Sequence, residues 1–153
     1  MLLKKGRILI LKRKYFLVGL FLMLVMFLAG CGSGIVTPAT DEEKVKSVIQ
    51  EYFLAINDQN WSKAKGCCVY GSDVYYETCI LEDGINALYQ YASVVTITCF
   101  ITISNVSVYD SYANAYCSGS ITITADYYSE SDNASGYLYL RKVGNDWKID
   151  SSD

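Results

Sequence analysis

The N-terminal segment of the chain divides into a basic part and an apolar part. Six Lys and Arg residues and no acidic residue precede Tyr15, and every residue from Tyr15 to Ala29 is apolar, aromatic or glycine. The apolar run is shorter than the roughly 20 residues that span a bilayer. A basic stretch followed by such a run is typical of an export signal. The pattern therefore predicts a cleavable signal peptide over residues 1–30 rather than a permanent transmembrane helix.

The apolar run ends in Leu28-Ala29-Gly30-Cys31, which resembles the lipobox of bacterial lipoproteins. In that class the cysteine is lipidated, becomes the new N-terminus and carries fatty acids such as palmitate. The resemblance implies a lipid anchor at Cys31 and an extracytoplasmic location at the cell membrane or envelope. The alternative is an ordinary signal peptide or membrane anchor with an incidental cysteine. Residues 31–39 are rich in Gly, Ser and Thr, which predicts a flexible tether.

Helical periodicity begins after this tether. Thr40 and Glu43 have the spacing of a capping box, in which each residue satisfies a backbone N–H of the other. Apolar residues then recur at the spacing of one helix face: Val45, Val48, Ile49, Tyr52, Phe53 and Ile56. The pattern predicts an amphipathic helix of about four turns.

Two shorter helices are predicted next. The first begins after the polar run that ends at Asn60, carries Trp61 and Ala64 on one face, and ends near Gly71. Ser72 and Asp73 are placed to cap a further turn. A third helix is expected to begin near Glu82 or Asp83, with the apolar face Ile85, Leu88, Tyr89 and Ala92.

From Val94 the apolar period changes to two, and β-branched residues dominate as far as Val108. The inward face shifts by one position at Ser104-Asn105, which predicts a β-bulge. A tight turn over residues 109–112 leads to a second strand, residues 113–125. With the bulge, apolar residues face each other: Val108 with Ala113, Ile103 with Cys117, Ile101 with Gly119 and Cys99 with Ile121.

The rest of the chain is predicted to form a loop and a hairpin. Residues 129–135 are polar, which predicts a loop. Residues 136–143 and 146–151 are expected to pair around a turn at Gly144-Asn145. In this register Leu140 lies opposite Ile149 and Lys142 opposite Trp147.

Three helices followed by a bulged four-stranded antiparallel meander resemble the nuclear-transport-factor-2-like (NTF2-like) superfamily, an α+β fold in which a curved sheet forms a cone around helices. Residues 48–64 are similar to the first two helices of many members, and residues 137–150 to their final hairpin. The resemblance implies one domain over residues 40–153. It concerns packing motifs, so it indicates the fold and says little about activity.

Ketosteroid isomerase-like and SnoaL-like members of the superfamily place an acid and a tyrosine in the cone. The strand positions expected to face inward here carry no acid, and Asp126 and Asp150 are expected to face outward. Asp73 and Glu77, beside Tyr75 and Tyr76, form an acid and tyrosine cluster near the expected mouth of the cone, although a solvated helix face is the simpler interpretation. Catalysis is therefore not expected, because general acid–base chemistry needs such a group at the reacting atoms.

Five cysteines follow Cys31: Cys67, Cys68, Cys79, Cys99 and Cys117. Zinc is not expected, since the chain has no His and no CxxC pair. Nucleophilic catalysis by a thiolate usually needs a neighbouring base, which the lack of His makes hard to supply. The strand register keeps Cys99 and Cys117 too far apart to bond. Cys79 with Cys67 or Cys68 is the better candidate for a disulfide.

Thirteen of the 14 tyrosines follow Cys31. The periodicity places Tyr52, Tyr89 and Tyr127 on inward faces, where they are candidates to bind a ligand. A second set falls on the outward face of the sheet and is a candidate surface for a homodimer or an envelope protein: Tyr116, Tyr137 and Tyr139. The alternative for this second set is a solvated sheet face.

The segment from Cys31 onward keeps seven basic and all 16 acidic residues, a net charge of −9. We therefore do not expect the protein to bind nucleic acid, because phosphate binding needs a basic surface. No cofactor is expected. The sequence favours a lipid-anchored, non-catalytic module that binds a small ligand or a protein. The alternative is a small enzyme of the same fold with an acid and tyrosine pair in its pocket.

Overall fold

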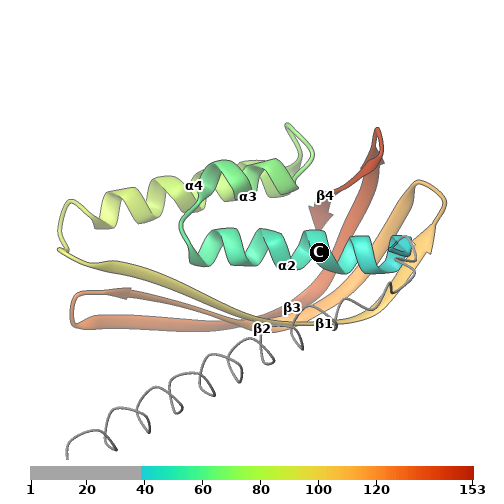
Figure 1. Cartoon of the computed structure of the whole chain (residues 1–153). Coiled ribbons are helices and arrows are strands. Elements are labelled where there is room, and N and C mark those ends of the chain that lie inside the picture. The colour runs from blue at the N-terminus through green and yellow to red at the C-terminus, as the bar shows by residue number, and fades with distance from the viewer. Residues whose placement is uncertain (1–38) are drawn as a thin grey trace, which may run out of the picture. The chain divides into compact units, whose positions relative to one another are not determined.

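The structure, a computed structural model, describes residues 39–153; the predicted signal peptide, Cys31 and the tether as far as Pro38 lie outside them. Three helices precede four strands, as predicted (Figure 1). The elements are α2 (Asp41–Asn57), α3 (Trp61–Cys67), α4 (Asp73–Leu88), β1 (Val95–Tyr109), β2 (Tyr112–Ala125), β3 (Tyr128–Val143) and β4 (Asp146–Ser152). The strands form one antiparallel sheet in the order β1-β2-β3-β4.

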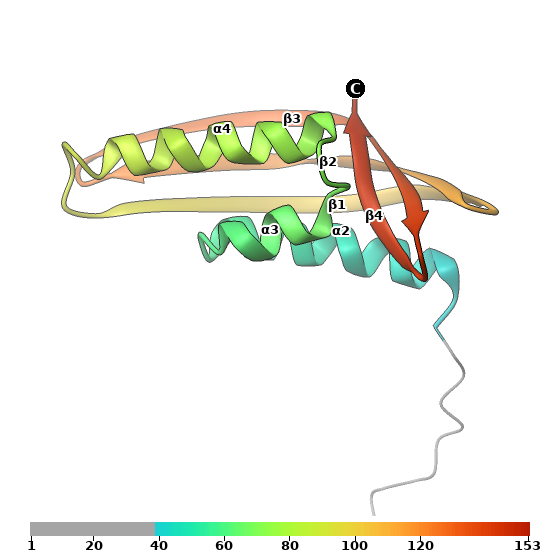
Figure 2. The same ribbon diagram turned by 90° about the horizontal axis from the view of Figure 1, so that it is seen from above.

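All three helices lie on the concave face of the curved sheet (Figures 1 and 2). Helix α2 packs against β1 and α3, while α4 packs against α3 and β4 and lies above β2 and β3. The core between the layers holds Ile49 and Ile56 of α2 and Leu140, Trp147 and Ile149 of β3 and β4. No helix among residues 39–153 is long and apolar enough to cross a membrane.

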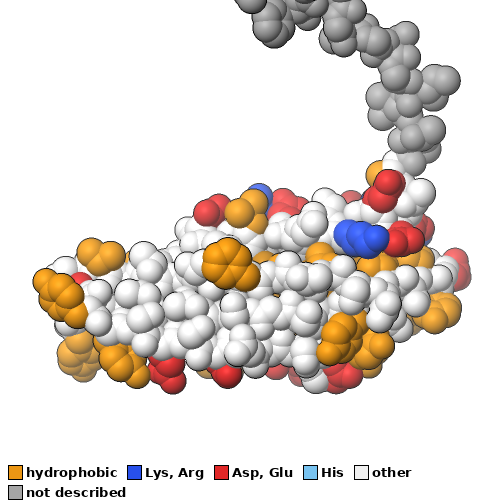
Figure 3. Space-filling model, turned by 90° about the horizontal axis from the view of Figure 1, so that it is seen from below, with side chains coloured by type: hydrophobic (Ala, Val, Ile, Leu, Met, Phe, Trp, Pro, Cys, Tyr) orange, Lys and Arg blue, Asp and Glu red, His pale blue; other side chains and the backbone are white. Residues whose placement is uncertain are grey.

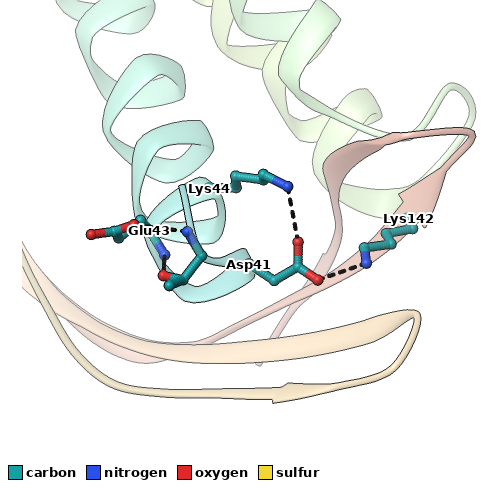
Figure 4. Close-up of polar contacts among 5 residues, drawn as sticks. Asp41, Glu43, Lys44 and Lys142 are labelled. Carbon is teal, nitrogen blue, oxygen red and sulfur yellow. Dashed lines mark hydrogen bonds and ion pairs between the residues drawn. The ribbon is translucent and has the colours of Figure 1, made fainter. Parts of the chain in front are cut away.

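The predicted capping box begins α2 and is confirmed. The Thr40 hydroxyl accepts from the Glu43 N–H, and the Glu43 carboxylate accepts from the Thr40 N–H (Figure 4). Next to this cap, Asp41 pairs with Lys142 of β3 at 2.7 Å and with Lys44 at 3.3 Å. The hydrogen bond from Lys142 is the main reason that the pKa of Asp41 falls to about 2. The start of α2 is thus fastened to the last hairpin.

The strand register is the one that the apolar pairing predicts. Cys99 lies opposite Ile121, Ile101 opposite Gly119 and Ile103 opposite Cys117. The bulge lies between Ser104 and Ser107, where Asn105 has a φ of 49°. Asn tolerates this left-handed conformation better than most residues do. The last hairpin also keeps its predicted pairs, with Leu140 opposite Ile149 and Lys142 opposite Trp147.

The free edge of β1 is partly covered by α2. The Asn57 side chain donates to the carbonyl of Cys99 at 3.2 Å and accepts from its N–H at 2.5 Å, as a neighbouring strand would. Gln59, in the turn after α2, donates to the carbonyl of Val95 at 2.9 Å. These contacts fix α2 along β1, which is the strand that it contacts most extensively.

Helix α4 begins nine residues earlier than the sequence predicts, at Asp73 rather than near Glu82. Ser72 is its N-cap, and Val74, Thr78 and Ile85 form its buried stripe. Two features hide this stripe in the sequence. Thr78 is polar but buried, because its hydroxyl bonds to Val74 O and to Tyr52 Oη, whereas Ile80 is apolar but exposed.

The predicted loop over residues 129–135 is wrong, because β3 is continuous from Tyr128 to Val143. Its first half pairs residue by residue with β2, including hydroxyl contacts from Thr122 to Ser131 and from Thr124 to Ser129. Residues 128–135 are exposed on both faces of the sheet. These residues are therefore polar because both faces of the strand are exposed to solvent there, and not because the segment is a loop.

Candidate functional site

Two adjoining pockets lie on the concave face of the sheet. One, of about 320 Å³, extends from Phe53 of α2 across Cys99 and Cys117 to Leu138 of β3. The other, of about 310 Å³, lies between Leu88 of α4 and the neighbouring halves of β2 and β3. Ile121 lines both pockets. We refer to the two together as the concave groove.

The groove exists because small residues occupy the sheet beneath it. Gly119, Ala134 and Gly136 line the first pocket, where larger side chains would fill the space. At Gly119 a Cβ would lie 1.8 Å from the carbonyl oxygen of Phe100, so only glycine permits this approach of β1 and β2. A Cβ at Gly136 would lie 2.6 Å from the carbonyl oxygen of Asp153.

Two carboxylates lie on the inner face of β3, which corrects the expectation that this face carries no acid. Glu130 lies opposite Ile123 and Asp132 opposite Ile121, and both acids line the second pocket. The expectation failed because residues 129–135 were taken for a loop. The alternation of Tyr128, Glu130 and Asp132 with serines is the signal in the sequence that marks them as one face of a strand.

Tyr128 completes this part of the groove. It lies opposite Ala125, and its hydroxyl is 3.4 Å from Oε2 of Glu130. Tyr128, Glu130 and Asp132 are all exposed to solvent. The second pocket therefore combines an apolar surface from α4 and β2 with an open, acidic wall from β3.

A larger depression of about 660 Å³ lies between α3 and the last hairpin and has basic residues in its wall. Each of these cations already has a partner. Lys65 pairs with Glu82 at 2.7 Å and Arg141 with Asp150 at 3.2 Å, while Lys148 donates to the carbonyl of Gly66. An anion bound there would compete with these contacts, so the depression is the weaker candidate for a ligand site.

The predicted ligand-binding tyrosines do not come together. Tyr52 is buried in the core, where its hydroxyl is 3.0 Å from that of Thr78 and burial raises its pKa to about 12. Tyr89 follows α4, and its hydroxyl donates at 3.0 Å to the carbonyl of Val95. Tyr127 is fully exposed in the turn after β2, so its predicted inward orientation is wrong. None of the three lines the concave groove.

The predicted cluster at the start of α4 does not form part of the groove either. Asp73, Tyr76 and Glu77 are exposed, and Tyr75 lines the basic depression instead. These side chains form a solvated helix face with edge-to-face ring contacts between Tyr75 and Tyr76 at 5.8 Å.

The predicted outward tyrosines do lie together. Tyr116 and Tyr137 face each other across β2 and β3 with ring centroids 5.2 Å apart, and Tyr139 follows at 6.3 Å from Tyr137. Only Tyr139 of the three counts as exposed, and its hydroxyl donates to Asp153. On the outer face of the sheet, hydrophobic side chains form separate patches among uncharged polar ones (Figure 3).

All five cysteines of the described region are free thiols. Cys99 and Cys117 are unbonded, as predicted, whereas the disulfide expected from Cys79 to Cys67 or Cys68 is not formed. Burial raises the pKa of Cys99 and of Cys117 to about 11, so both stay protonated near neutral pH. No three His, Cys, Asp or Glu side chains within residues 39–153 are placed to hold a metal ion.

Comparison with solved structures identifies the class of the fold. A proposed dehydratase of the NTF2-like family from Streptomyces avermitilis matches with a TM-score of 0.58 and 15% identity, over 76% of this chain and 95% of that one. A conserved protein from Planctomyces limnophilus matches with a TM-score of 0.56 and 12% identity, over 71% and 90%. An NTF2-like protein with a cystatin-like fold from Novosphingobium aromaticivorans gives 0.54 and 16%, over 71% and 77%.

The described domain therefore has the NTF2-like, cystatin-like cone fold. At these identities the likeness concerns the fold alone. No protein-family model and no curated protein matches the sequence.

Proposed function

We propose that the protein is a lipid-anchored module of the cell envelope that binds a small, partly apolar molecule in the concave groove without transforming it. The observation that carries this proposal is the groove itself. Its two parts, of about 320 and 310 Å³, are each within the usual size of small-molecule sites, roughly 300–1,000 Å³. Ile121, Ile123 and Leu88 supply apolar surface that a ligand would remove from water.

The anchoring part of the proposal rests on the sequence. The basic stretch, the apolar run and the lipobox-like Leu28-Ala29-Gly30-Cys31 occur in the order that lipoproteins require. Lipidation would hold the groove next to the membrane surface, where partly apolar molecules are concentrated. Metabolic labelling with an alkyne analogue of palmitate tests this part. Cys31→Ala should abolish labelling and Cys79→Ala should not; equal labelling of both variants would contradict the anchor.

Absence of catalysis is supported by the exposure of the groove carboxylates. General acids and bases are usually buried or paired with an opposite charge, whereas Glu130 and Asp132 are exposed and form no ion pair within residues 39–153. One observation favours an enzyme as the second candidate: the Tyr128 hydroxyl lies 3.4 Å from Oε2 of Glu130 in the groove wall, so an acid and a tyrosine do lie side by side there. An enzymatic activity that is lost both in the Tyr128→Phe variant and in the Glu130→Gln variant would establish that alternative.

The outer sheet face is proposed as a secondary contact surface for a second copy or an envelope protein. The support is the aromatic row Tyr116, Tyr137 and Tyr139, since tyrosine is enriched at interfaces. Changing all three to Ser should weaken self-association or capture of the partner in sedimentation velocity of the full chain. Unchanged association of a folded triple variant would show that this face is only solvated.

Ligand binding is tested by blocking the groove where its two parts meet. Ile121→Trp places a large ring at the residue that lines both pockets. Thr122→Trp is the matched control, because the next residue of the same strand points to the opposite face. We expect the full-length protein to bind the neutral fluorescent probe N-phenyl-1-naphthylamine, and Ile121→Trp to lose this binding while Thr122→Trp keeps it. Equal binding by the two variants would contradict the groove as the site.

A further inference from the structure

The second pocket of the concave groove, between Leu88 and strands β2 and β3, carries negative charge that no basic residue of the described chain neutralises. Glu130 and Asp132 are two residues apart on one face of β3, so their Cα atoms are about 7 Å apart. Neither forms an ion pair within residues 39–153. Helix α4 and strands β1 and β2, which surround this part of the groove, contain no Lys or Arg.

The same region has apolar surface directly beside the charge. Ile121 and Ile123 are the cross-strand neighbours of Asp132 and Glu130, and Leu88 of α4 closes the pocket from above. Cross-strand neighbours have Cβ atoms about 5 Å apart. A ligand that covers the isoleucines therefore brings its end group within reach of the carboxylates.

We propose that the groove selects small amphipathic cations, in which an apolar body ends in a protonated amine or a quaternary ammonium group. This inference rests on the proposed function and adds the class of ligand. The apolar body covers Ile121, Ile123 and Leu88, and the cation lies between Glu130 and Asp132. The exposed ring of Tyr128 in the same wall provides an additional favourable surface for a cation.

The size of the charge effect follows from exposure. Ion pairs at exposed positions contribute little each, because water screens them. Two carboxylates acting on one cation should therefore give a preference of about threefold to tenfold over a neutral ligand of the same shape. The preference should shrink as salt is raised, because the Debye length falls from about 10 Å at 0.1 M to about 3 Å at 1 M.

Three probes that share one apolar body isolate the charge: 4-phenylbutylammonium, 4-phenylbutan-1-ol and 4-phenylbutanoate. Their affinities are measured by calorimetry at low salt on the full-length protein in zwitterionic nanodiscs, with empty nanodiscs as the blank for partitioning. We expect the cation to bind most tightly and the anion most weakly. The variant Glu130→Gln/Asp132→Asn should bind cation and alcohol equally.

The control variant is Asp110→Asn/Asp146→Asn, which removes the same charge from the turn between β1 and β2 and from the first residue of β4. It should keep the cation preference. If no probe binds, the proposed function fails, and this inference fails with it. If the alcohol binds and the cation binds no better, or if both double variants lose the preference equally, the groove remains a binding site and the assignment of its ligand class is overturned.

Discussion

The two ends of the domain treat charge in opposite ways. All seven Lys and Arg of the described region lie on α2, α3 or the last hairpin, and each has a partner: six side chains pair with carboxylates, and Lys148 bonds to the carbonyl of Gly66. At the other end, where β2 turns into β3, the acids Glu130 and Asp132 face an apolar groove without any basic neighbour.

The difference separates what holds the fold from what is available to a ligand. At the end formed by α2, α3 and the last hairpin, which we call the balanced end, Lys142 links α2 to β3 through Asp41. Its amine lies 5.0 Å from the centre of the ring of the buried Trp147. At the other end, near the turn from β2 to β3, which we call the unbalanced end, Glu130 and Asp132 form no ion pair and are exposed to water. Unpaired like charges on one strand face oppose folding slightly rather than favour it. Stability therefore does not account for their presence, whereas the proposed binding of a cation would.

The largest difference between the two ends should appear on truncation of their apolar side chains. Trp147 is 2% exposed, so Trp147→Ala should destabilise the protein by about 3–5 kcal/mol. Ile123 in the groove is only partly buried, so Ile123→Ala should cost about 1 kcal/mol. Urea unfolding followed by circular dichroism measures both. Similar losses would mean that the groove is as well packed as the core.

The next effect concerns acid stability at the balanced end. The pKa of Asp41 in the folded protein is about 2, below its ordinary value of 3.8, because the hydrogen bond from Lys142 stabilises the carboxylate. A lowered pKa means that the contribution to stability is present above the unfolded value and is lost as pH falls through the folded one. Asp41→Asn should therefore be less stable than the unaltered protein near neutral pH, and the two should converge between about pH 4 and pH 2. A difference that does not change with pH would refute the assignment.

The smallest effect is expected for the unbalanced acids. Glu130→Gln/Asp132→Asn should leave the free energy of unfolding within about 0.5 kcal/mol of the unaltered value, or raise it slightly, because no ion pair is lost. Thermal unfolding without ligand checks this. A large loss of stability would show that these carboxylates support the fold, and the contrast between the two ends would disappear.

The sequence predicted the fold well where the buried face of an element is formed by apolar residues. The register of β1 with β2 and the bulge before Ser107 follow from pairing apolar residues, because a slip of one position would expose them all. Assigning strands from the positions of apolar residues failed where both faces of the sheet are exposed. Residues 129–135 are exposed on both sides, so no apolar face marks them as a strand, and the predicted loop concealed Glu130 and Asp132.

Two errors in the candidate site have a similar cause. Tyr127 was assigned an inward orientation by extending strand alternation past Ala125, where the chain in fact turns and Asp126 adopts a φ of 50°. Tyr52 faces inward as predicted, but whether it meets a cavity or the side chain of Thr78 depends on packing that periodicity cannot show. The outward tyrosines were assigned correctly to one face, because β2 and β3 are regular there.

The most direct test of the account is a map of where a ligand binds. Amide and methyl chemical shifts of the full-length protein, recorded while 4-phenylbutan-1-ol is added, report contact residue by residue without invoking charge. The account predicts the largest changes at Leu88, Ile121 and Ile123. Changes centred instead on the basic depression at Lys65 and Lys148, or on the outer face at Tyr116 and Tyr137, would contradict the concave groove as the binding site.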